Sequence, residues 1–266
     1  MGIEIGAVMI PWYGLFIVLG IAAGALLGYF LIRANRMDYD DFIQTACFVG
    51  LGAMAGAKLL YLIVSWRSID FSRITDPEYL NALMGGGFVF YGGLIGGLTG
   101  LYLCGKILHI PVTDYARAAI PVIPLVHAFG RIGCAFAGCC YGVPYDGPGA
   151  VVYTESIAAP TGVPLFPVQA VEAAGNLLIT AVLCIYGEIC RRKGRKAKSL
   201  QLYLVLYAVF RFALEFARYD DSERGILMGL STSQWISIVI CSVVIGMEIL
   251  ACRKKITQKS FEKCEK

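Results

Sequence analysis

The sequence predicts an all-α, polytopic membrane protein with seven transmembrane helices, and two observations lead to this fold class. Of the 266 residues, 58% are hydrophobic and only 16% are charged, with a mean hydropathy of +0.67. A soluble domain is far less apolar. A membrane span needs about 20 apolar residues, and seven stretches meet this need: Met9–Ile32, Phe42–Ser65, Met84–Cys104, Thr113–Ala137, Phe166–Cys190, Leu200–Arg218 and Ser233–Ala251.

These stretches take up nearly the whole chain. We therefore expect one seven-helix membrane domain over residues 1–251, a basic cytoplasmic tail over residues 252–266, and no separate soluble domain. The connections on one side, together with the tail, carry fifteen lysines and arginines, and the other side carries three. Because cationic loops stay in the cytoplasm, the N-terminus is predicted outside and the C-terminus inside. The net charge of +4 then reflects this topology and anionic lipid at the inner surface, and it gives no reason to expect nucleic acid.

Five of the stretches carry a polar residue at a similar distance from their outer end. These residues are Lys58, Tyr91, Arg131, Glu172 and Arg211. At about 1.5 Å of rise per residue, all five lie roughly 9 to 14 Å below the outer boundary. Polar groups at such depth normally face a bundle interior or a watery cavity. Because the inner half of the membrane lacks a similar layer, the pattern predicts a cavity open to the outer leaflet rather than a channel or a transporter.

The third stretch is rich in glycine on both sides of Tyr91. Such a helix can pack closely against a neighbour through small residues. The glycines also fit a broken or re-entrant segment beside a cavity. In that case Tyr91 could donate to a phosphate oxygen or act as an acid or base.

The fourth stretch ends in a glycine-rich motif, Gly130 to Gly142, that contains Arg131. Glycine lets a backbone or a lipid headgroup approach closely, so a guanidinium held here could clamp a phosphate. The alternative is a cation at a helix end that reaches toward water. The loop that follows, from Gly138 to Pro167, is long enough to be functional or a lid.

The sixth stretch predicts one polar helix face, because Tyr207, Arg211, Glu215 and Arg218 stand at i, i+4, i+8 and i+11. Arg211 and Glu215 can form an ion pair, which makes the charge tolerable in the membrane, and Arg218 remains for a ligand. A purely structural ion-pair network between helices is the alternative.

Three of the ten cysteines cluster, at Cys134, Cys139 and Cys140. Together with His127 they could form a membrane thiol redox site or a metal site. However, their C-x4-C-C spacing lacks the C-x-x-C of thiol oxidoreductases. The cysteines within the other spans behave as small apolar residues.

Six motifs along the chain resemble the prolipoprotein diacylglyceryl transferase family. The likeness covers nearly the whole sequence and keeps the order of the family. The motifs are Trp12-Tyr13-Gly14-Leu15, Tyr91-Gly-Gly-Leu-Ile-Gly96, Gly130-Arg131-Ile-Gly133 with Gly138 and Gly142, Pro167-Val-Gln-Ala-Val-Glu172, Tyr207 to Arg218, and Leu230-Ser-Thr-Ser-Gln234.

The resemblance implies an enzyme of the bacterial cytoplasmic membrane with its active site facing the outer leaflet. Such an enzyme moves the diacylglyceryl group of phosphatidylglycerol to the lipobox cysteine thiol of a preprolipoprotein and releases glycerol phosphate. This is the first step of bacterial lipoprotein maturation, and it needs no metal or organic cofactor. The implied catalytic residues are Arg131, Arg211, Tyr91 and Glu215. The implied phosphatidylglycerol-binding residues are Arg131, Tyr13, Tyr207, Gly142 and Arg218.

The chain departs from the family where chemistry is expected. Cys134, Ala137 and Cys139 replace two asparagines and a glutamate, and Tyr91 stands where many members have histidine. Tyrosine is a poor base at its usual pKa of about 10, so the general base is unassigned. Arg131 could lower that pKa, or water or a displaced headgroup oxygen could take the proton. On the transferase interpretation the three cysteines pack around the headgroup turn. A lipid-modifying paralogue with another acceptor is the main alternative.

Overall fold

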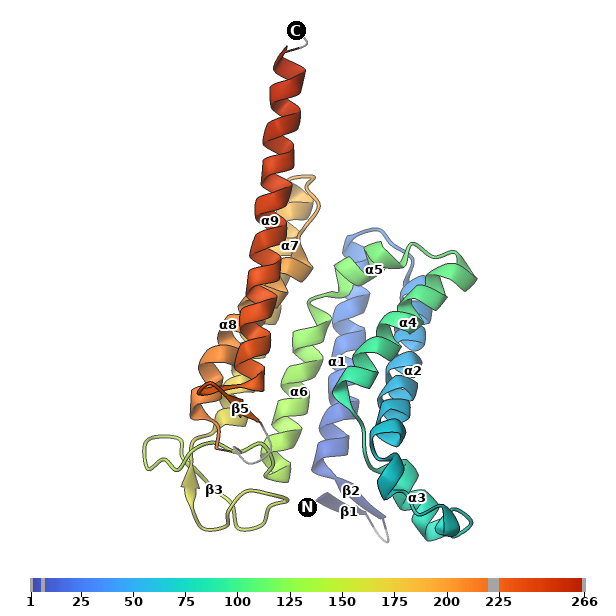
Figure 1. Ribbon diagram of the computed structural model, residues 1–266, viewed down its shortest axis with the longest axis vertical. Helices are drawn as coiled ribbons and strands as arrows, with labels where there is room; N and C mark the ends of the chain where they lie inside the picture. Colours follow the sequence, from blue (N-terminus) through green and yellow to red (C-terminus); the bar gives the residue numbers. More distant parts are fainter. Residues whose placement is uncertain (1, 6–7, 220–224, 265–266) are drawn as a thin grey trace. The chain divides into compact units, whose positions relative to one another are not determined.

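The computed structural model describes residues 2–5, 8–219 and 225–264, and these are mostly helical (Figure 1). The long helices are α1 (Trp12–Ala34), α2 (Tyr39–Val64), α4 (Phe90–Leu108), α6 (Val122–Ala137), α7 (Val168–Arg192), α8 (Ser199–Leu214) and α9 (Thr232–Cys264). The short helices are α3 (Pro77–Gly85) and α5 (Val112–Ala119), with single 3₁₀ turns η1 (Trp66–Ser68), η2 (Phe71–Arg73) and η3 (Glu215–Ala217).

The all-α prediction is confirmed in that the described chain is mostly helical, and three short antiparallel strand pairs lie outside the helices. They are β1 (Gly2–Ile5) with β2 (Val8–Pro11), β3 (Val151–Val152) with β4 (Pro164–Leu165), and β5 (Ile226–Leu227) with β6 (Leu230–Ser231). Such pairs satisfy backbone groups in connections where no helix does so.

The predicted spans lie where the structure has apolar helices, and two of these spans correspond to bent pairs of helices. Five helices are long and apolar enough to cross a membrane, and the number is up to seven if each bent pair is one span. α3 and α4 meet at 76°, and α5 and α6 meet at 50°. The first bend follows a glycine run in which Gly87 has a φ of +68°. The second contains Pro121, which disfavours helical backbone in the residue before it.

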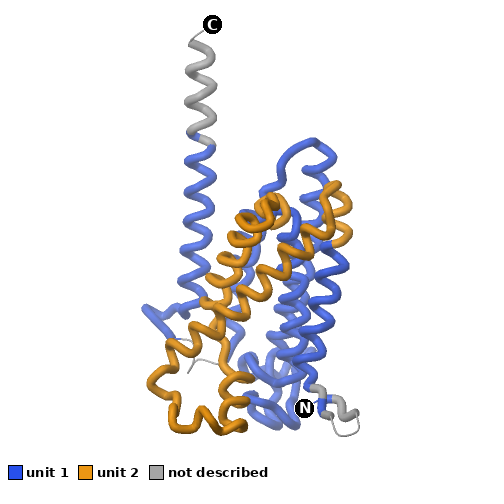
Figure 2. Tube along the Cα trace, turned by 90° about the vertical axis from the view of Figure 1, so that its right-hand side faces the viewer, with its two compact units in different colours: residues 1–28, 117–266 blue, residues 29–116 orange. Residues whose placement is uncertain are grey.

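The chain divides into two compact units (Figure 2). Unit 1 comprises residues 1–28 and 117–266, and unit 2 comprises residues 29–116. Unit 2 is built on α2 and α4. Added Cβ atoms at Gly52 and Gly56 of α2 would overlap backbone of Gly92 and Gly96 of α4. The two backbones therefore touch, as small residues permit. The third stretch is thus both a closely packed helix and a broken one.

Lys58 of α2 is held by the end of the neighbouring short helix. Its Nζ donates hydrogen bonds to the carbonyl oxygens of Leu83, at 2.5 Å, and Gly86, at 2.6 Å, and it lies over the ring of Tyr61. The last carbonyls of a helix lack partners within the helix and carry partial negative charge. Lys58 therefore caps the C-terminal end of α3, at the break between α3 and α4.

Unit 1 contains α6, α7, α8, α9 and the first part of α1. α1 packs on α6 through its glycines, since a Cβ at Gly20 would meet the side chain of Phe129 at 2.8 Å. Ile179 and Leu183 of α7 form a core with apolar residues of α8. α9 begins with a capping box, in which the Ser231 N–H donates to Gln234 Oε1 at 3.0 Å and the Gln234 N–H donates to Ser231 Oγ at 3.3 Å.

Two sequence expectations change at the helix ends. α9 continues to Cys264, so residues 252–264 of the expected tail are helical, and residues 265–266 lie outside the described part. α8 ends at Leu214, and Arg218 has extended backbone with a φ of −93° and a ψ of 151°. Arg218 is therefore not on the helix face predicted for it, because residues 217–219 bond to the loop at residues 141–143 instead.

Candidate functional site

Arg131 lies in the last two turns of α6, where it meets a buried carboxylate of α7. Its Nε is 3.1 Å from Glu172 Oε2 and 3.2 Å from His127 Nε2. Glu172 Oε1 is also 3.7 Å from His127 Nε2. The Glu172 side chain is 1% exposed and that of Arg131 is 17% exposed. Among the described residues both contacts of Arg131 use Nε, so its two terminal amino groups can meet an anion in fork geometry.

The second ion pair joins Arg211 and Glu215, as their spacing predicts. Arg211 Nη1 lies 2.6 Å from Glu215 Oε2, and Arg211 Nη2 donates to Ser233 Oγ at 3.3 Å. The carboxylate is again buried, at 2% exposure, while the arginine keeps 12%. A pair held this way gives the guanidinium a fixed position at the cost of desolvating both charges.

Tyr207 of α8 lies where the charged groups converge. It is within electrostatic range of Glu172 and of three arginines, which are Arg131, Arg211 and Arg218. Its ring centroid is 5.5 Å from that of His127. The structure thus brings Tyr207 together with the arginines that the sequence singled out, which suits recognition of an anion with more than one oxygen.

Gly142 and Arg218 meet although they are far apart in the sequence. They form an isolated antiparallel β-bridge, and a Cβ at Gly142 would lie 2.5 Å from the Phe166 carbonyl oxygen and 3.0 Å from that of Ala217. Only glycine permits this approach. The bridge fixes the backbone from which Arg218 projects.

Tyr13, on the first turn of α1, belongs to the same region. A Cβ at Gly133 would lie 3.2 Å from the Tyr13 ring, and Tyr13 is within electrostatic range of Arg131 and of all three clustered cysteines. α1 is held here by stacking of Trp12 and Phe16 on Phe136, with ring centroids 5.3 and 5.1 Å apart.

Three polar residues of this site lie outside the predicted catalytic and headgroup-binding residues, and they are His127, Gln169 and Glu172. The sequence marked Glu172 only as one of the polar residues at common depth, and it marked His127 only as a fourth ligand beside the clustered cysteines. Buried Gln169 donates to the carbonyl oxygen of Cys139 at 2.9 Å and to the Tyr153 hydroxyl at 3.2 Å. Burial raises the pKa of Tyr153, in the long loop, so that its hydroxyl stays neutral.

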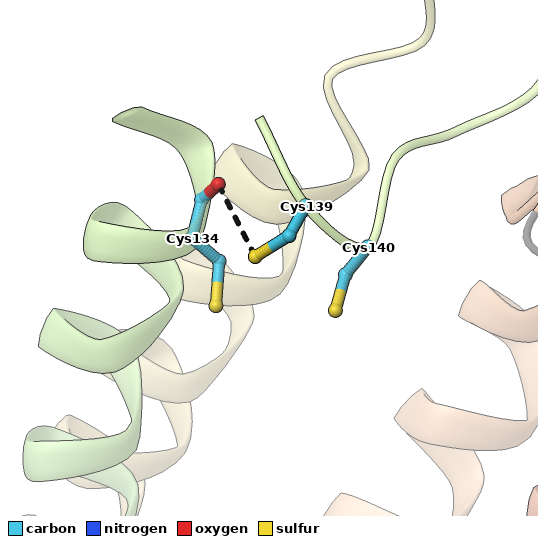
Figure 3. Close-up of side chains that lie close together, drawn as sticks. All are labelled: Cys134, Cys139 and Cys140. Atoms are coloured by element: carbon cyan, nitrogen blue, oxygen red, sulfur yellow. Dashed lines mark hydrogen bonds between the residues drawn. The ribbon is translucent and has the colours of Figure 1, made fainter. Parts of the chain in front are cut away.

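The sulfur atoms of Cys134, Cys139 and Cys140 lie within 4.8 Å of one another (Figure 3). The Cys139 thiol donates to the carbonyl oxygen of Cys134 at 3.8 Å. His127 is not a member of this group, because its ring nitrogen bonds to Arg131 and faces Glu172. The idea of a site made of three cysteines and this histidine is therefore wrong in its fourth ligand.

Tyr91 is the predicted site residue that the described contacts do not join to the others. It stands on the first turn of α4 in unit 2, is 52% exposed, and packs edge-on against Phe90. The catalytic role of Tyr91 stays a prediction.

The comparisons with known proteins agree on one family. The sequence profile described as prolipoprotein diacylglyceryl transferase matches residues 1–250. The chain belongs to this family. The phosphatidylglycerol–prolipoprotein diacylglyceryl transferase 2 of Clostridium perfringens is 36% identical over 239 residues, which are 89% of each chain. The phosphatidylglycerol–prolipoprotein diacylglyceryl transferase of Clostridium tetani is 37% identical over 246 residues, or 92% of this chain and 93% of the relative. That of Polynucleobacter asymbioticus is 31% identical over 256 residues, or 93% of each.

Proposed function

We propose that this member transfers the diacylglyceryl group of phosphatidylglycerol to the lipobox cysteine thiol of a preprolipoprotein. One observation carries the proposal: Arg131, Arg211 and Arg218 gather around Tyr207 while the paired carboxylates are buried. A phosphodiester headgroup is an anion that this arrangement can bind. The family match over nearly the whole chain favours this activity over a thiol redox protein.

The reaction is a displacement at the glyceryl carbon next to the phosphate. The acceptor thiol gives its proton to water, its sulfur forms a bond to this carbon, the carbon–oxygen bond breaks, and the phosphate oxygen leaves with the electron pair. Negative charge grows on the departing phosphate, so guanidinium forks at fixed positions stabilise the transition state. Arg131 and Arg211 are the proposed catalytic arginines. Glu172 and Glu215 are positioning residues, because they contact the arginines. Tyr13, Tyr207, Gly142 and Arg218 line the proposed headgroup site.

The proposed place of the reaction is the outer leaflet of a bacterial cytoplasmic membrane, crossed seven times when each bent helix pair is one span. The cation distribution supports an outside N-terminus and a cytoplasmic C-terminus. Thr161 and Lys196 are both exposed and lie in loops on opposite predicted sides. In intact cells an impermeant thiol reagent should label Thr161→Cys and should not label Lys196→Cys, relative to the unmodified chain. Labelling of Lys196→Cys from outside would reverse the topology.

The activity itself is tested with the full-length protein in vesicles that contain phosphatidylglycerol. A peptide bearing a lipobox cysteine should gain the mass of a diacylglyceryl group, and glycerol phosphate should appear in equal amount. Vesicles of phosphatidylethanolamine alone should give no product, and neither should a peptide with serine in place of the cysteine. If the wild-type protein modifies another acceptor and leaves the lipobox peptide unchanged, it is the paralogue considered above.

A further inference from the structure

The three clustered cysteines converge because of the way in which α6 ends. The Gly138 N–H donates to the Ala135 carbonyl at 3.3 Å and the Cys139 N–H donates to the Cys134 carbonyl at 3.2 Å, while Gly138 has a φ of +65°. This is a Schellman motif, in which the second residue after the helix, here Cys139, bonds back to a residue in the last turn of the helix, here Cys134. Cys139 therefore lies beside Cys134, five residues earlier in the sequence.

Cys140 is the third member of the group, and its backbone has a conformation that few residues other than glycine adopt. Its φ is +55°, in the left-handed region, where a residue other than glycine costs roughly 1 to 2 kcal/mol. Strained positions of this kind collect at functional sites. The strain turns Cys140 toward the other two thiols, and Figure 3 shows all three side chains beside one another at the end of α6.

The separation of the sulfur atoms suits a small thiophilic metal ion. Zinc binds thiolates at about 2.3 Å in tetrahedral geometry, which places the sulfurs about 3.8 Å apart. The three sulfurs already lie within 4.8 Å, so rotations of the cysteine side chains are enough to close the site. Thiolate ligands select zinc or copper(I) over magnesium or calcium.

The surroundings also suit the charge of such a site. Three thiolates and one Zn²⁺ carry a net charge of −1. Cys140 is within electrostatic range of both Arg131 and Arg218, and Cys134 is within range of Arg131. Guanidinium groups at this range offset the negative charge, which a half-buried site would otherwise resist.

Among the described residues the group offers three metal ligands. In the described part of the chain no histidine, aspartate or glutamate joins the three cysteines at metal-binding distance. Structural zinc sites have four protein ligands, whereas catalytic ones have three and an exchangeable fourth. Three ligands among the described residues match the number of protein ligands in a catalytic zinc site.

We propose that Cys134, Cys139 and Cys140 hold a zinc ion whose open position binds the thiol of the acceptor cysteine. This inference rests on the proposed function and supplies what that function lacks. No residue of the proposed site has been assigned as the general base that takes the proton of the acceptor thiol. A thiol that binds zinc loses its proton, and the thiolate is the nucleophile.

The balance of the reaction is unchanged by the metal. The acceptor S–H bond breaks as sulfur binds zinc, and the proton goes to water. The sulfur lone pair then forms the S–C bond, and the C–O electron pair leaves on the phosphate, which Arg131 receives. The thioether product binds zinc weakly and departs. No oxidant or reductant takes part. This proposal departs from the expectation, implied by the family resemblance, that no metal is needed.

Metal content gives the first test, and it does not depend on activity. The full-length protein, purified in detergent without chelators, should contain about one zinc per chain by mass spectrometry of the elements. Cys134→Ser, Cys139→Ser and Cys140→Ser should each lose most of it. Cys241→Ser on α9, outside the cluster, is the matched control and should keep both zinc and activity. Zinc-free wild-type protein with full transfer activity, or a reducible disulfide among the three cysteines, would overturn the proposal.

The open position is tested with cobalt in place of zinc, because cobalt–thiolate absorption reports the ligands. The lipobox cysteine peptide should change the visible spectrum of the cobalt protein, and the serine peptide should not. Removal of zinc should slow transfer by about 100-fold, the size of a lost proton acceptor, and added zinc should restore it. A cobalt spectrum that ignores the cysteine peptide would refute the open position.

Failure of the proposed function would look different. Arg211→Ala should lose transfer and keep its zinc, because Arg211 pairs with Glu215 and Ser233 rather than with the cysteines. If wild-type protein binds zinc and the peptide thiol but moves no diacylglyceryl group from phosphatidylglycerol, the metal site stands and the proposed lipid donor is wrong.

Discussion

Units 1 and 2 both place charged side chains in apolar helices, but they satisfy these charges in different ways. In unit 2 the ammonium group of Lys58 is bound by the carbonyl oxygens of Leu83 and Gly86, and it completes a helix end. In unit 1 the guanidinium groups of Arg131 and Arg211 pair with buried carboxylates and keep some exposed surface. A charge in a membrane helix is therefore a weak sign of function until its partners are known.

The two units also differ in what brings their helices together. α2 and α4 of unit 2 touch backbone to backbone at glycines, which requires small residues and little side-chain chemistry. In unit 1, α1 also packs on α6 through glycines, but these meet side chains. α7 and α8 join through larger apolar side chains, and Arg131 of α6 forms an ion pair with Glu172 of α7. Substitutions should accordingly affect stability in unit 2 and catalysis in unit 1.

The largest effect is expected for Arg131→Lys. Charge is kept, but an ammonium group cannot form two parallel hydrogen bonds to a phosphodiester. Transfer should fall by about 100-fold or more, as when a fixed donor to a developing anion is lost. The measurement is diacylglyceryl transfer per folded molecule in phosphatidylglycerol vesicles. Arg73→Lys, at an exposed cation paired with Asp76 in unit 2, is the matched control and should be normal. Wild-type rates for Arg131→Lys would mean that Arg131 only reaches toward water.

Gly56→Ala tests the backbone contact between α2 and α4 of unit 2. An added methyl group at Gly56 overlaps the α4 backbone, and overpacking of this kind costs about 1 to 3 kcal/mol. The thermal midpoint of the full-length protein in detergent should fall. Gly50→Ala on the same helix meets nothing within 4 Å and should raise the midpoint slightly, because alanine favours helix over glycine by about 1 kcal/mol. Equal midpoints for the two variants would contradict the backbone contact.

A smaller effect is expected for Glu215→Gln. The amide keeps the size of the side chain, but it no longer attracts the Arg211 guanidinium by charge. We expect kcat/KM for phosphatidylglycerol to fall by about tenfold, in line with a loss of roughly 1.4 kcal/mol. A positioning role predicts that Glu215→Asp recovers part of this loss and that the thermal midpoint changes little. A large fall in the midpoint with normal kinetics would instead make the ion pair structural.

The parts of this site that the sequence predicted are those set by local geometry. The apolar stretches mark the helices because a span needs a fixed length, and Arg211 meets Glu215 because residues four apart share a helix face. Arg218 was misplaced because α8 ends at Leu214, and that end depends on hydrogen bonds between residues 217–219 and the distant segment 141–143.

Contacts between helices could not be read from spacing. Arg131 meets Glu172 only because α6 packs on α7.

The cysteine cluster depends partly on local geometry and partly on features that the sequence does not reveal. The Gly138 motif that returns Cys139 to Cys134 is local, but the left-handed turn at Cys140 is unusual for a residue with a side chain. Sequence reasoning therefore found the three cysteines and could not show that their sulfurs converge.

The smallest effect is expected for Lys58→Met, which tests whether depth alone makes a polar residue functional. The change removes two hydrogen bonds from a charged donor to helix-end carbonyls and keeps most of the side-chain volume. Charged hydrogen bonds contribute roughly 1.5 to 3 kcal/mol, and the partial exposure of Lys58 reduces this figure. The thermal midpoint should therefore fall modestly, while transfer per folded molecule stays within about twofold, a difference of roughly 0.4 kcal/mol. Lys58→Arg, which can still donate to carbonyl oxygens, should recover part of the stability. A loss of transfer of more than tenfold in folded Lys58→Met protein would place Lys58 in the reaction and remove the distinction between the two units.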